Sequence, residues 1–333
     1  MPSFLEERLR YADRATEFPV TRLTSPKFAS LLAAPGHRVI SRRGTFLIYA
    51  SHRGGAPQLV QLMLATGEAR PLTETAALDP LSPALAPDDR SVFYFDGPAL
   101  KRFVFAGQRE TEVYRVPEGW TRGRGFAMAA DGARACLVET RDGRWRVRLA
   151  PLAPHAEPAT AFEADAPLSD PLPRPRHDEI LCRDSENFLA LSGRRLPLAP
   201  GRAGTAFWAG DGESLLYLNF PEGGGQNTVR EWVAASASDR LVTPTSQYAA
   251  FAPNANASIF VGASASKASP YILLALRITH RELALCEHGS SDAAAVAPFF
   301  SPDSQRVFFE SDRDGKPAIY MMDVERLVER TEA

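Results

Sequence analysis

The stretch SPDSQRVFFESDRDGKPAIYMMDV (Ser301–Val324) alternates turn signals with apolar runs near the C-terminus. SPDS and DRDG are rich in Ser, Asp and Gly, which tolerate left-handed backbone and form local side-chain hydrogen bonds. RVFFE and AIYMM are rich in β-branched and aromatic residues, which favour strands. The stretch therefore predicts two turns and two short strands, and the same pattern recurs upstream.

Six further copies of a turn followed by an apolar run precede this one, at a period of about 40 residues. Three read LAPDDRSVFYF (Leu85–Phe95), WAGDGESLLYL (Trp208–Leu218) and FAPNANASIFV (Phe251–Val261). The others are SRRGTFLIYA (Ser41–Ala50), MAADGARACLV (Met128–Val138) and the weakest copy, PRHDEILCR (Pro175–Arg183). We assign the turns to Gly44, Asp88, Asp131, Asp178, Asp211, Asn254 and Asp303, at spacings of 44, 43, 47, 33, 43 and 49.

This periodicity predicts an all-β, seven-bladed β-propeller. A two-sheet sandwich is the alternative, but it does not explain a regular period. The phrase PVTRLTSP (Pro19–Pro26) resembles the end of other copies, such as SDRLVTPT (Ser238–Thr245), whereas the last copy has only three strands. We therefore expect Val20–Thr24 to supply the outer strand of the last blade and to close the ring. Residues 18–333 form a single domain in this interpretation, after an N-terminal extension of residues 1–17.

Composition narrows the classes of partner. The 333 residues carry a formal net charge of −2, which argues against nucleic acid or a membrane surface as the main partner. Cys136, Cys182 and Cys286 lack metal-site spacing, so we expect reduced thiols in the core. The N-terminal residues are charged and include no secretory signal, so a cytoplasmic protein is expected.

No nucleotide-binding or hydrolase motif is present. The sequence contains no GxGxxG after a strand, no GxxxxGK[ST], no HExxH and no GxSxG. The histidines have no metal-ligand spacing and are expected in exposed loops; they are His37, His52, His155, His177, His280 and His288.

Propellers concentrate function at the central channel, so we compared equivalent positions of the seven copies. The residues six positions before each assigned turn are Arg38, Ser82, Gly125, Leu172, Thr205, Tyr248 and Ala297. A metal centre needs several His or carboxylate ligands. This set offers mostly small or apolar groups.

The phrases VTRLTSP, EVYRVPEGWTRGRG, AFWAGDGESLLYL and PFFSPDSQRVFFESDRDGKPAIYMMDV resemble the oligogalacturonate lyases. The resemblance runs from about Phe18 to Val328 and is weakest across Pro151–Pro200. It implies a seven-bladed propeller related to TolB-like repeats, and a role in pectin degradation by β-elimination of short oligogalacturonides.

In that family, as the resemblance implies, His residues and a Gln hold Mn²⁺, a further His is the general base, and an Arg assists. The base position falls here on Thr205, and one ligand position falls on Tyr248. The segment with two further His ligands falls on Asp292–Ala297, so these become Ala295 and Ala297. The Arg has no clear match in Cys182–Ser192. We therefore predict no catalytic residue and no metal or other cofactor.

A binding site for an acidic oligosaccharide or a small anion is the remaining prediction, because guanidinium groups suit carboxylates. Arginines before the third and fourth turns are expected near one sector of the channel mouth. The predicted ligand-binding residues are Arg38, Trp120, Arg122, Arg124, Arg174, Arg176, Gln247 and Tyr248. A lyase with a rebuilt site, in which Tyr248 is the base, is an alternative, and a platform for protein–protein interaction is another.

Overall fold

The computed structural model describes residues 2–153, 157–184, 187–190 and 195–331. These residues form 29 strands, and no helix occurs among them. Consequently no helix in the described ranges could cross a membrane.

The described strands form seven sheets, which are numbered here in the chain order of their inner strands. Sheet 1 has the order β1 (Phe4–Leu5), β7 (Glu68–Pro71), β6 (Gln58–Met63), β5 (Phe46–Ser51), β4 (Ser30–Leu31). Sheet 2 has β11 (Arg109–Arg115), β10 (Ala99–Val104), β9 (Ser91–Asp96), β8 (Ala84–Leu85). Sheet 3 has β12 (Thr121–Met128), β13 (Arg134–Arg141), β14 (Arg144–Pro151), β15 (Ala159–Ala164).

Sheets 4 to 7 continue the pattern. Sheet 4 has β16 (Ser169–Pro173), β17 (Ile180–Asp184), β18 (Asn187–Ala190). Sheet 5 has β19 (Arg202–Trp208), β20 (Ser214–Phe220), β21 (Thr228–Val233), β22 (Ser238–Pro244). Sheet 6 has β23 (Tyr248–Pro253), β24 (Ile259–Ser264), β25 (Tyr271–Leu276), β26 (Glu282–Glu287). Sheet 7 has β2 (Leu9–Ala12), β3 (Pro19–Arg22), β29 (Ala318–Asp323), β28 (Arg306–Ser311), β27 (Phe299–Phe300).

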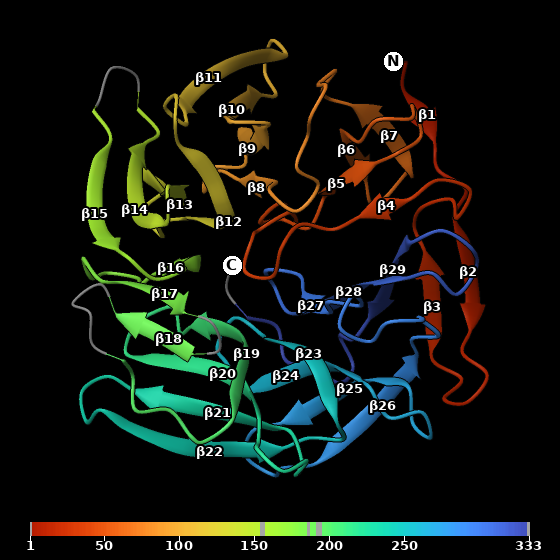
Figure 1. Cartoon of the computed structure of the whole chain (residues 1–333). Coiled ribbons are helices and arrows are strands. Elements are labelled where there is room, and N and C mark those ends of the chain that lie inside the picture. The colour runs from red at the N-terminus through yellow and green to blue at the C-terminus, as the bar shows by residue number, and fades with distance from the viewer. Residues whose placement is uncertain (1, 154–156, 185–186, 191–194, 332–333) are drawn as a thin grey trace.

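The sheets surround a common centre in chain order, with β4, β8, β12, β16, β19, β23 and β27 innermost (Figure 1). The prediction of an all-β propeller is confirmed. Each inner strand runs into a tight turn before the second strand begins. We call this end of the channel the turn face, and the opposite end, where the inner strands start, the mouth.

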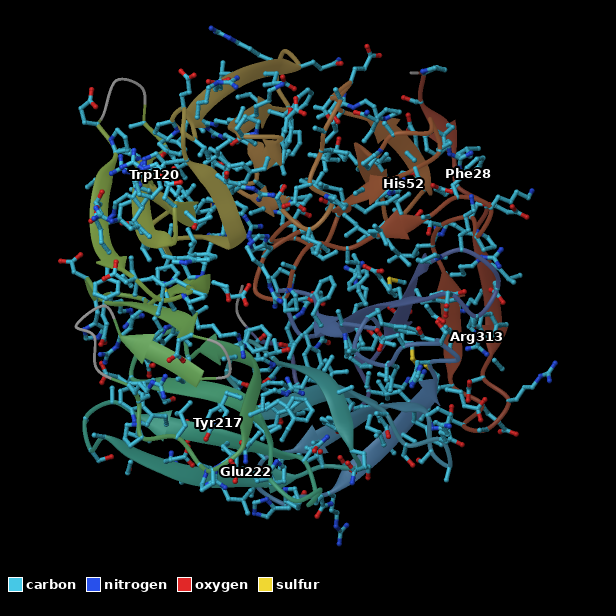
Figure 2. All side chains as sticks on the ribbon, viewed as in Figure 1. Phe28, His52, Trp120, Tyr217, Glu222 and Arg313 are labelled. Carbon is cyan, nitrogen blue, oxygen red and sulfur yellow. The ribbon has the colours of Figure 1, made fainter. Side chains whose placement is uncertain are left out.

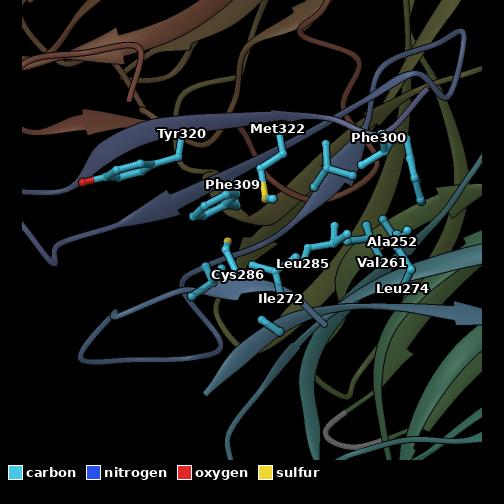
Figure 3. Packing of buried hydrophobic residues seen from close by; sticks show 14 of the residues in the cluster. Ala252, Val261, Ile272, Leu274, Leu285, Cys286, Phe300, Phe309, Tyr320 and Met322 are labelled. Carbon is cyan, nitrogen blue, oxygen red and sulfur yellow. The ribbon is translucent and has the colours of Figure 1, made fainter. Parts of the chain in front are cut away.

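The second strand of each sheet lies between two neighbouring sheets and is buried along most of its length. β9, β20 and β24 show this burial, which explains their continuous apolar sequences. Figure 3 shows the packing between sheets 6 and 7, where Ala252, Val261 and Ile272 lie near Phe300, Phe309 and Met322. Cys136, Cys182 and Cys286 are buried free thiols, as predicted.

The N-terminal segment closes the ring. β3 pairs antiparallel with β29, with Thr21 opposite Met321 and Arg22 opposite Tyr320, so the predicted outer strand of the last sheet is confirmed. β2 adds a further strand outside β3, and β1 adds one outside β7 of sheet 1. Glu6, next to β1, is buried and accepts a hydrogen bond of 2.6 Å from the Tyr49 hydroxyl.

A loop from sheet 1 enters the channel. Leu31 pairs with Ala50 and Ile40 pairs with Leu47, so residues 32–39 lie opposite only residues 48 and 49. The excess chain, which contains Pro35 and the left-handed Gly36 (φ 90°), cannot stay in the strand and loops out. We call residues 32–38 the channel loop.

Candidate functional site

Backbone hydrogen bonds at the turn face define the equivalent positions of the seven sheets. In each turn the N–H of one residue bonds the C=O five positions later, and the first residues are Ser41, Ala86, Ala129, Arg174, Ala209, Asn254 and Ser301. In four sheets the residue that we assigned to the turn lies two positions after this first residue. The same rule in the other three sheets replaces Gly44, Asp178 and Asn254 by Arg43, Arg176 and Asn256. Correspondingly, the residues six positions earlier are His37, Ser82, Gly125, Asp170, Thr205, Ala250 and Ala297.

Two titratable side chains therefore occupy this ring, and our comparison of the sequence copies missed both. His37 and Asp170 replace Arg38 and Leu172, and Ala250 replaces Tyr248. The left-handed backbone at three equivalent positions, Gly125 (φ 81°), Asp170 (φ 46°) and Ala297 (φ 40°), supports the new register. The ring therefore contains a histidine from sheet 1, which was absent from the set of equivalent positions compared in the sequence.

His37 lies at the tip of the channel loop and joins three sheets. Its Nδ1 is 3.2 Å from the Pro83 carbonyl oxygen of sheet 2, and its Nε2 is 2.7 Å from the Phe126 carbonyl oxygen of sheet 3. Burial lowers the pKa of His37, although these carbonyls and Asp79 oppose the shift. A neutral imidazole has one N–H and can donate to only one of the two carbonyls.

The prediction of exposed histidines holds for His177 and His280 but not for His37 or His288. His288 is buried, and its Nδ1 accepts a hydrogen bond from the Ser290 N–H. Its Nε2, 2.9 Å from the Ser264 carbonyl oxygen, is therefore the protonated nitrogen. His52 is half-buried, and His155 lies outside the described residues.

Arginines gather around one carboxylate at the mouth. Asp170, at the start of β16, lies 3.1 Å from Nη2 of Arg124 and 3.4 Å from Nε of Arg183. The Arg183 guanidinium is largely buried and donates to the Gly204 carbonyl oxygen at 2.7 Å. Burial lowers the pKa of Arg183; Asp170 opposes this shift, and the nearby positive charges of Arg124 and Arg202 add to it. Among the described residues, Arg124 and Arg183 therefore contact the same carboxylate, and Arg202 is close enough for its charge to act on Arg183.

Only Arg124 of our predicted arginines belongs to this group, which we call the arginine cluster: Arg124 and Arg183, which contact Asp170, and Arg202, whose charge acts on Arg183. Arg122 lies close by in β12, but its Nη2 is 2.6 Å from Asp79. Arg38 leaves the mouth and pairs with Asp89 near the turn of sheet 2.

Arg174 and Arg176 lie at the turn face. Arg174 pairs with Glu179 at 2.9 Å and donates to the Gly212 carbonyl oxygen at 2.6 Å. Arg176 is exposed within the turn. A strand rises about 3.3 Å per residue, so the four positions from Asp170 to Arg174 span roughly 13 Å. The structure does not bring these two arginines to the mouth.

Trp120 faces arginines of its own sheet. The Arg146 and Arg141 guanidinium carbons lie 3.5 and 4.5 Å from its ring centroid. Figure 2 shows Trp120 well away from the centre of the ring. The two predicted residues at the start of β23, Gln247 and Tyr248, differ in burial. Gln247 is exposed in left-handed backbone (φ 58°), whereas Tyr248 is fully buried.

Tyr248 packs against Gly262, where an added Cβ would lie 2.1 Å from the phenol ring. Burial raises the pKa of Tyr248 well above its ordinary value, and the Glu282 carboxylate raises it further. A buried phenol that keeps its proton is poorly placed to accept one from a substrate, which argues against Tyr248 as the base of a rebuilt lyase site.

A cavity of about 370 Å³ occupies the channel between sheets 1, 5, 6 and 7. Its walls are residues 33–40, Phe207, residues 250–253, Ala255 and residues 297–302. Ala250 and Ala297 of the inner ring line it, together with His37 and Arg38. Of our eight predicted site residues, this cavity contains Arg38.

The mapped metal positions do not fit a divalent cation. Ala295, Ala297 and Ala250, which replaces Tyr248 in the corrected register, carry no ligand atom in their side chains. Within residues that the structure describes, no three His, Cys, Asp or Glu side chains gather to hold a metal ion.

Glu310 lies beside this region and was missed in the sequence. Its backbone N–H bonds the Val296 carbonyl oxygen at 2.9 Å, and its carboxylate accepts a hydrogen bond from the Leu32 N–H. Burial raises the pKa of Glu310 to about 8, against the lowering effect of the Leu32 N–H. Since the apolar surroundings come from other sheets, no local sequence signal identifies this residue.

Comparison with known proteins agrees with this fold. A sequence model described as oligogalacturonate lyase matches residues 7–152. An oligogalacturonate lyase from Dickeya dadantii (strain 3937) is 22% identical, over 94% of this chain and 95% of its own length. A solved oligogalacturonate lyase in complex with manganese has a TM-score of 0.89 at 22% identity, covering 97% of each chain. That from Vibrio parahaemolyticus has a TM-score of 0.88 at 20% identity, covering 97% and 98%.

These similarities extend over nearly the whole chain, and the propeller fold and the repeat phrases agree with them. The chain is similar to oligogalacturonate lyases over nearly its whole length and shares their propeller fold.

Proposed function

We propose that this chain is a seven-bladed propeller, each sheet being one blade, that binds a small acidic sugar at the channel mouth without catalysing its cleavage. The arginine cluster carries the proposal: Arg124 and Arg183 contact the Asp170 carboxylate, and the positive charge of Arg202 reaches Arg183. A carboxylate is the group that a planar guanidinium binds best, and the exposed Arg124 can receive one from solvent. A cytoplasmic location, and partners other than nucleic acid or membranes, belong to the same proposal.

The two arginines nearest Asp170 have different tasks. Arg183 is held between Asp170 and the Gly204 carbonyl oxygen, so its position is fixed before a ligand arrives. The Arg124 side chain is 78% exposed and retains free donors toward solvent. The fixed inner cation, Arg183, and the exposed outer cation, Arg124, suit a ligand that enters from solvent and presents a carboxylate.

The proposal excludes the family's metal and base chemistry at the positions where the resemblance locates it. Thr205 and Ala297 have no basic nitrogen, and Ala295 offers no ligand atom. A uronate held here would keep its α-proton unless another base were present.

Calorimetric titration with digalacturonate tests the proposal, with galactobiose, the matched uncharged disaccharide, as ligand control. We expect digalacturonate to bind and galactobiose not to bind. Arg124→Gln should weaken digalacturonate binding roughly tenfold, since charge-assisted hydrogen bonds contribute about 1.5–3 kcal/mol. Arg144→Gln, at an exposed arginine of the same sheet, should bind as the wild type does. Equal binding of both sugars would contradict the proposal.

A lyase with a rebuilt site is the second candidate, and Glu310 is the observation in its favour. A buried carboxyl group that titrates near neutral pH is suited to general acid–base catalysis. Ultraviolet absorbance of unsaturated product, with and without Mn²⁺, separates the two candidates. Turnover that Glu310→Gln abolishes would establish the lyase and overturn a role in binding alone.

A further inference from the structure

The cavity in the channel is separate from the arginine cluster. Its walls are segments of sheets 1, 5, 6 and 7, and they include Ala255 and Pro302 at the turn face. The arginine cluster lies on sheets 3, 4 and 5, and none of its side chains lines the cavity. A ligand held by the cluster would therefore leave this space unfilled.

The lining is mostly apolar. Four phenylalanines contribute to it, together with alanine, proline, valine and isoleucine: Phe207, Phe251, Phe299 and Phe300. Phe207 and Phe299 are only partly buried, although each packs on a second ring, Phe251 or Phe308, at 5.4 and 5.6 Å between centroids. Both rings are thus fixed by a neighbour and keep part of their surface accessible.

The polar groups of the lining already have partners inside the protein. Arg38 pairs with Asp89 and donates to the Ala86 carbonyl oxygen. The His37 ring nitrogens face two carbonyl oxygens, and burial favours the uncharged imidazole. The Ser301 hydroxyl donates to Asp303 at 2.6 Å. An ion entering the cavity would find no unpaired charge among these groups and would lose its hydration.

Small residues create the space. Ala250 and Ala297 occupy two of the seven inner-ring positions, and Ala33 and Ala34 form the wall contributed by the channel loop. The Ala34 N–H bonds the Leu81 carbonyl oxygen at 2.9 Å, which fixes this wall to sheet 2. The cavity is consequently framed by anchored backbone.

We propose that this cavity is a second binding site, which takes a small uncharged aromatic or apolar molecule. Its volume falls in the range of known small-molecule pockets, about 300–1,000 Å³. Apolar walls hold water weakly, and contact with the aromatic rings stabilises an apolar ligand by roughly 25 cal/mol for each Å² removed from water. This site differs from the proposed sugar site in position and in the charge of its ligand.

Fluorescence titration with N-phenyl-1-naphthylamine, an uncharged aromatic probe that brightens in apolar surroundings, tests the proposal. We expect saturable binding of one probe per chain, with no competition from digalacturonate. Ala34→Phe should fill the cavity and weaken probe binding at least tenfold. Ala76→Phe, at an exposed alanine outside the cavity, should leave binding unchanged.

Ala297→Leu narrows the same cavity from sheet 7 and serves as a second variant, and thermal unfolding verifies that each variant is folded. Binding that does not saturate, or that both folded cavity variants retain, would overturn the proposal. Displacement of the probe by digalacturonate would overturn the separation of the two sites. Failure of digalacturonate to bind at all would contradict only the sugar site.

Discussion

Nε of Arg183 lies 3.4 Å from Oδ2 of Asp170, so the buried cation of the mouth is paired with a carboxylate on the neighbouring strand of its own sheet. Asp170→Asn removes that negative charge while keeping the size of the side chain. Digalacturonate should then bind roughly threefold to tenfold more tightly, because the incoming carboxylate no longer meets a like charge. Asp165→Asn, at an exposed aspartate on the approach to β16, is the matched control in the titration. Weaker binding by Asp170→Asn would mean that Asp170 chiefly orients the arginines.

Glu310 should make the free energy of unfolding depend on pH between about 4.5 and about 8. The unfolded chain loses this proton near pH 4.5, whereas the raised native pKa retains it to about pH 8. The native state holds more protons in that window, so the free energy of unfolding should fall as pH rises from about 4.5 to about 8. Glu310→Gln should remove this decline and gain about 2–4 kcal/mol at pH 8.5, since one pKa unit equals about 1.4 kcal/mol.

Urea unfolding of both proteins across this pH range measures the effect. Glu325→Gln, at an exposed glutamate near the C-terminus, should retain the wild-type slope. Parallel curves for wild type and Glu310→Gln would contradict the assigned titration.

His37 should lower the free energy of unfolding at acidic pH. Its native pKa is below the ordinary value of 6.5, so the unfolded state binds the proton first as pH falls. Stability should therefore decrease below about pH 6.5, and buried His288 contributes in the same direction. His37→Gln should flatten part of this decrease in thermal unfolding scans between pH 5 and pH 7. His280→Gln, at an exposed histidine, should not; a steeper acid loss in His37→Gln would show that the native site favours the cation.

Glu6 should anchor the N-terminal segment. Its buried carboxylate accepts hydrogen bonds from Tyr49 and from the Ser25 N–H, and it lies 3.1 Å from Arg53. Glu6→Ala leaves these donors without their acceptor, and we expect a loss of about 3–5 kcal/mol in urea unfolding. Glu7→Ala, one residue later, removes an exposed pair with Lys27 and a hydrogen bond of 3.3 Å from the Ser25 hydroxyl, and it should cost much less. Equal losses in the two variants would rule out the anchoring role.

The repeat phrases predicted most of the architecture because each turn is made by its own residues. Oδ1 of Asp88, Asp131 and Asp211 accepts the N–H two residues later, which is the local bond expected of aspartate in a turn. The outer strand of sheet 7 was also predictable. The phrase PVTRLTSP resembles the outer strands of other copies, although it is distant in the sequence from the rest of its sheet.

The channel residues could not be predicted to the same extent. Copies 1, 4 and 6 contain several residues suited to a turn, and only the backbone hydrogen bonds select Arg43, Arg176 and Asn256. A shift of one or two positions exchanged Arg38 for His37 and Leu172 for Asp170. The partners of the arginines come from other sheets, as Asp79 does for Arg122, so their pairing depends on the assembled ring.

The pairing of Thr21 with Met321 also constrains the order of events on the ribosome. β3 is among the first segments to leave the exit tunnel, yet its partner β29 is among the last. Until then β3 lacks its native neighbour, and the nascent chain has an open β edge at each end of the incomplete ring. A chain that stops before β29 cannot close, so quality control of truncated products would act on these two edges.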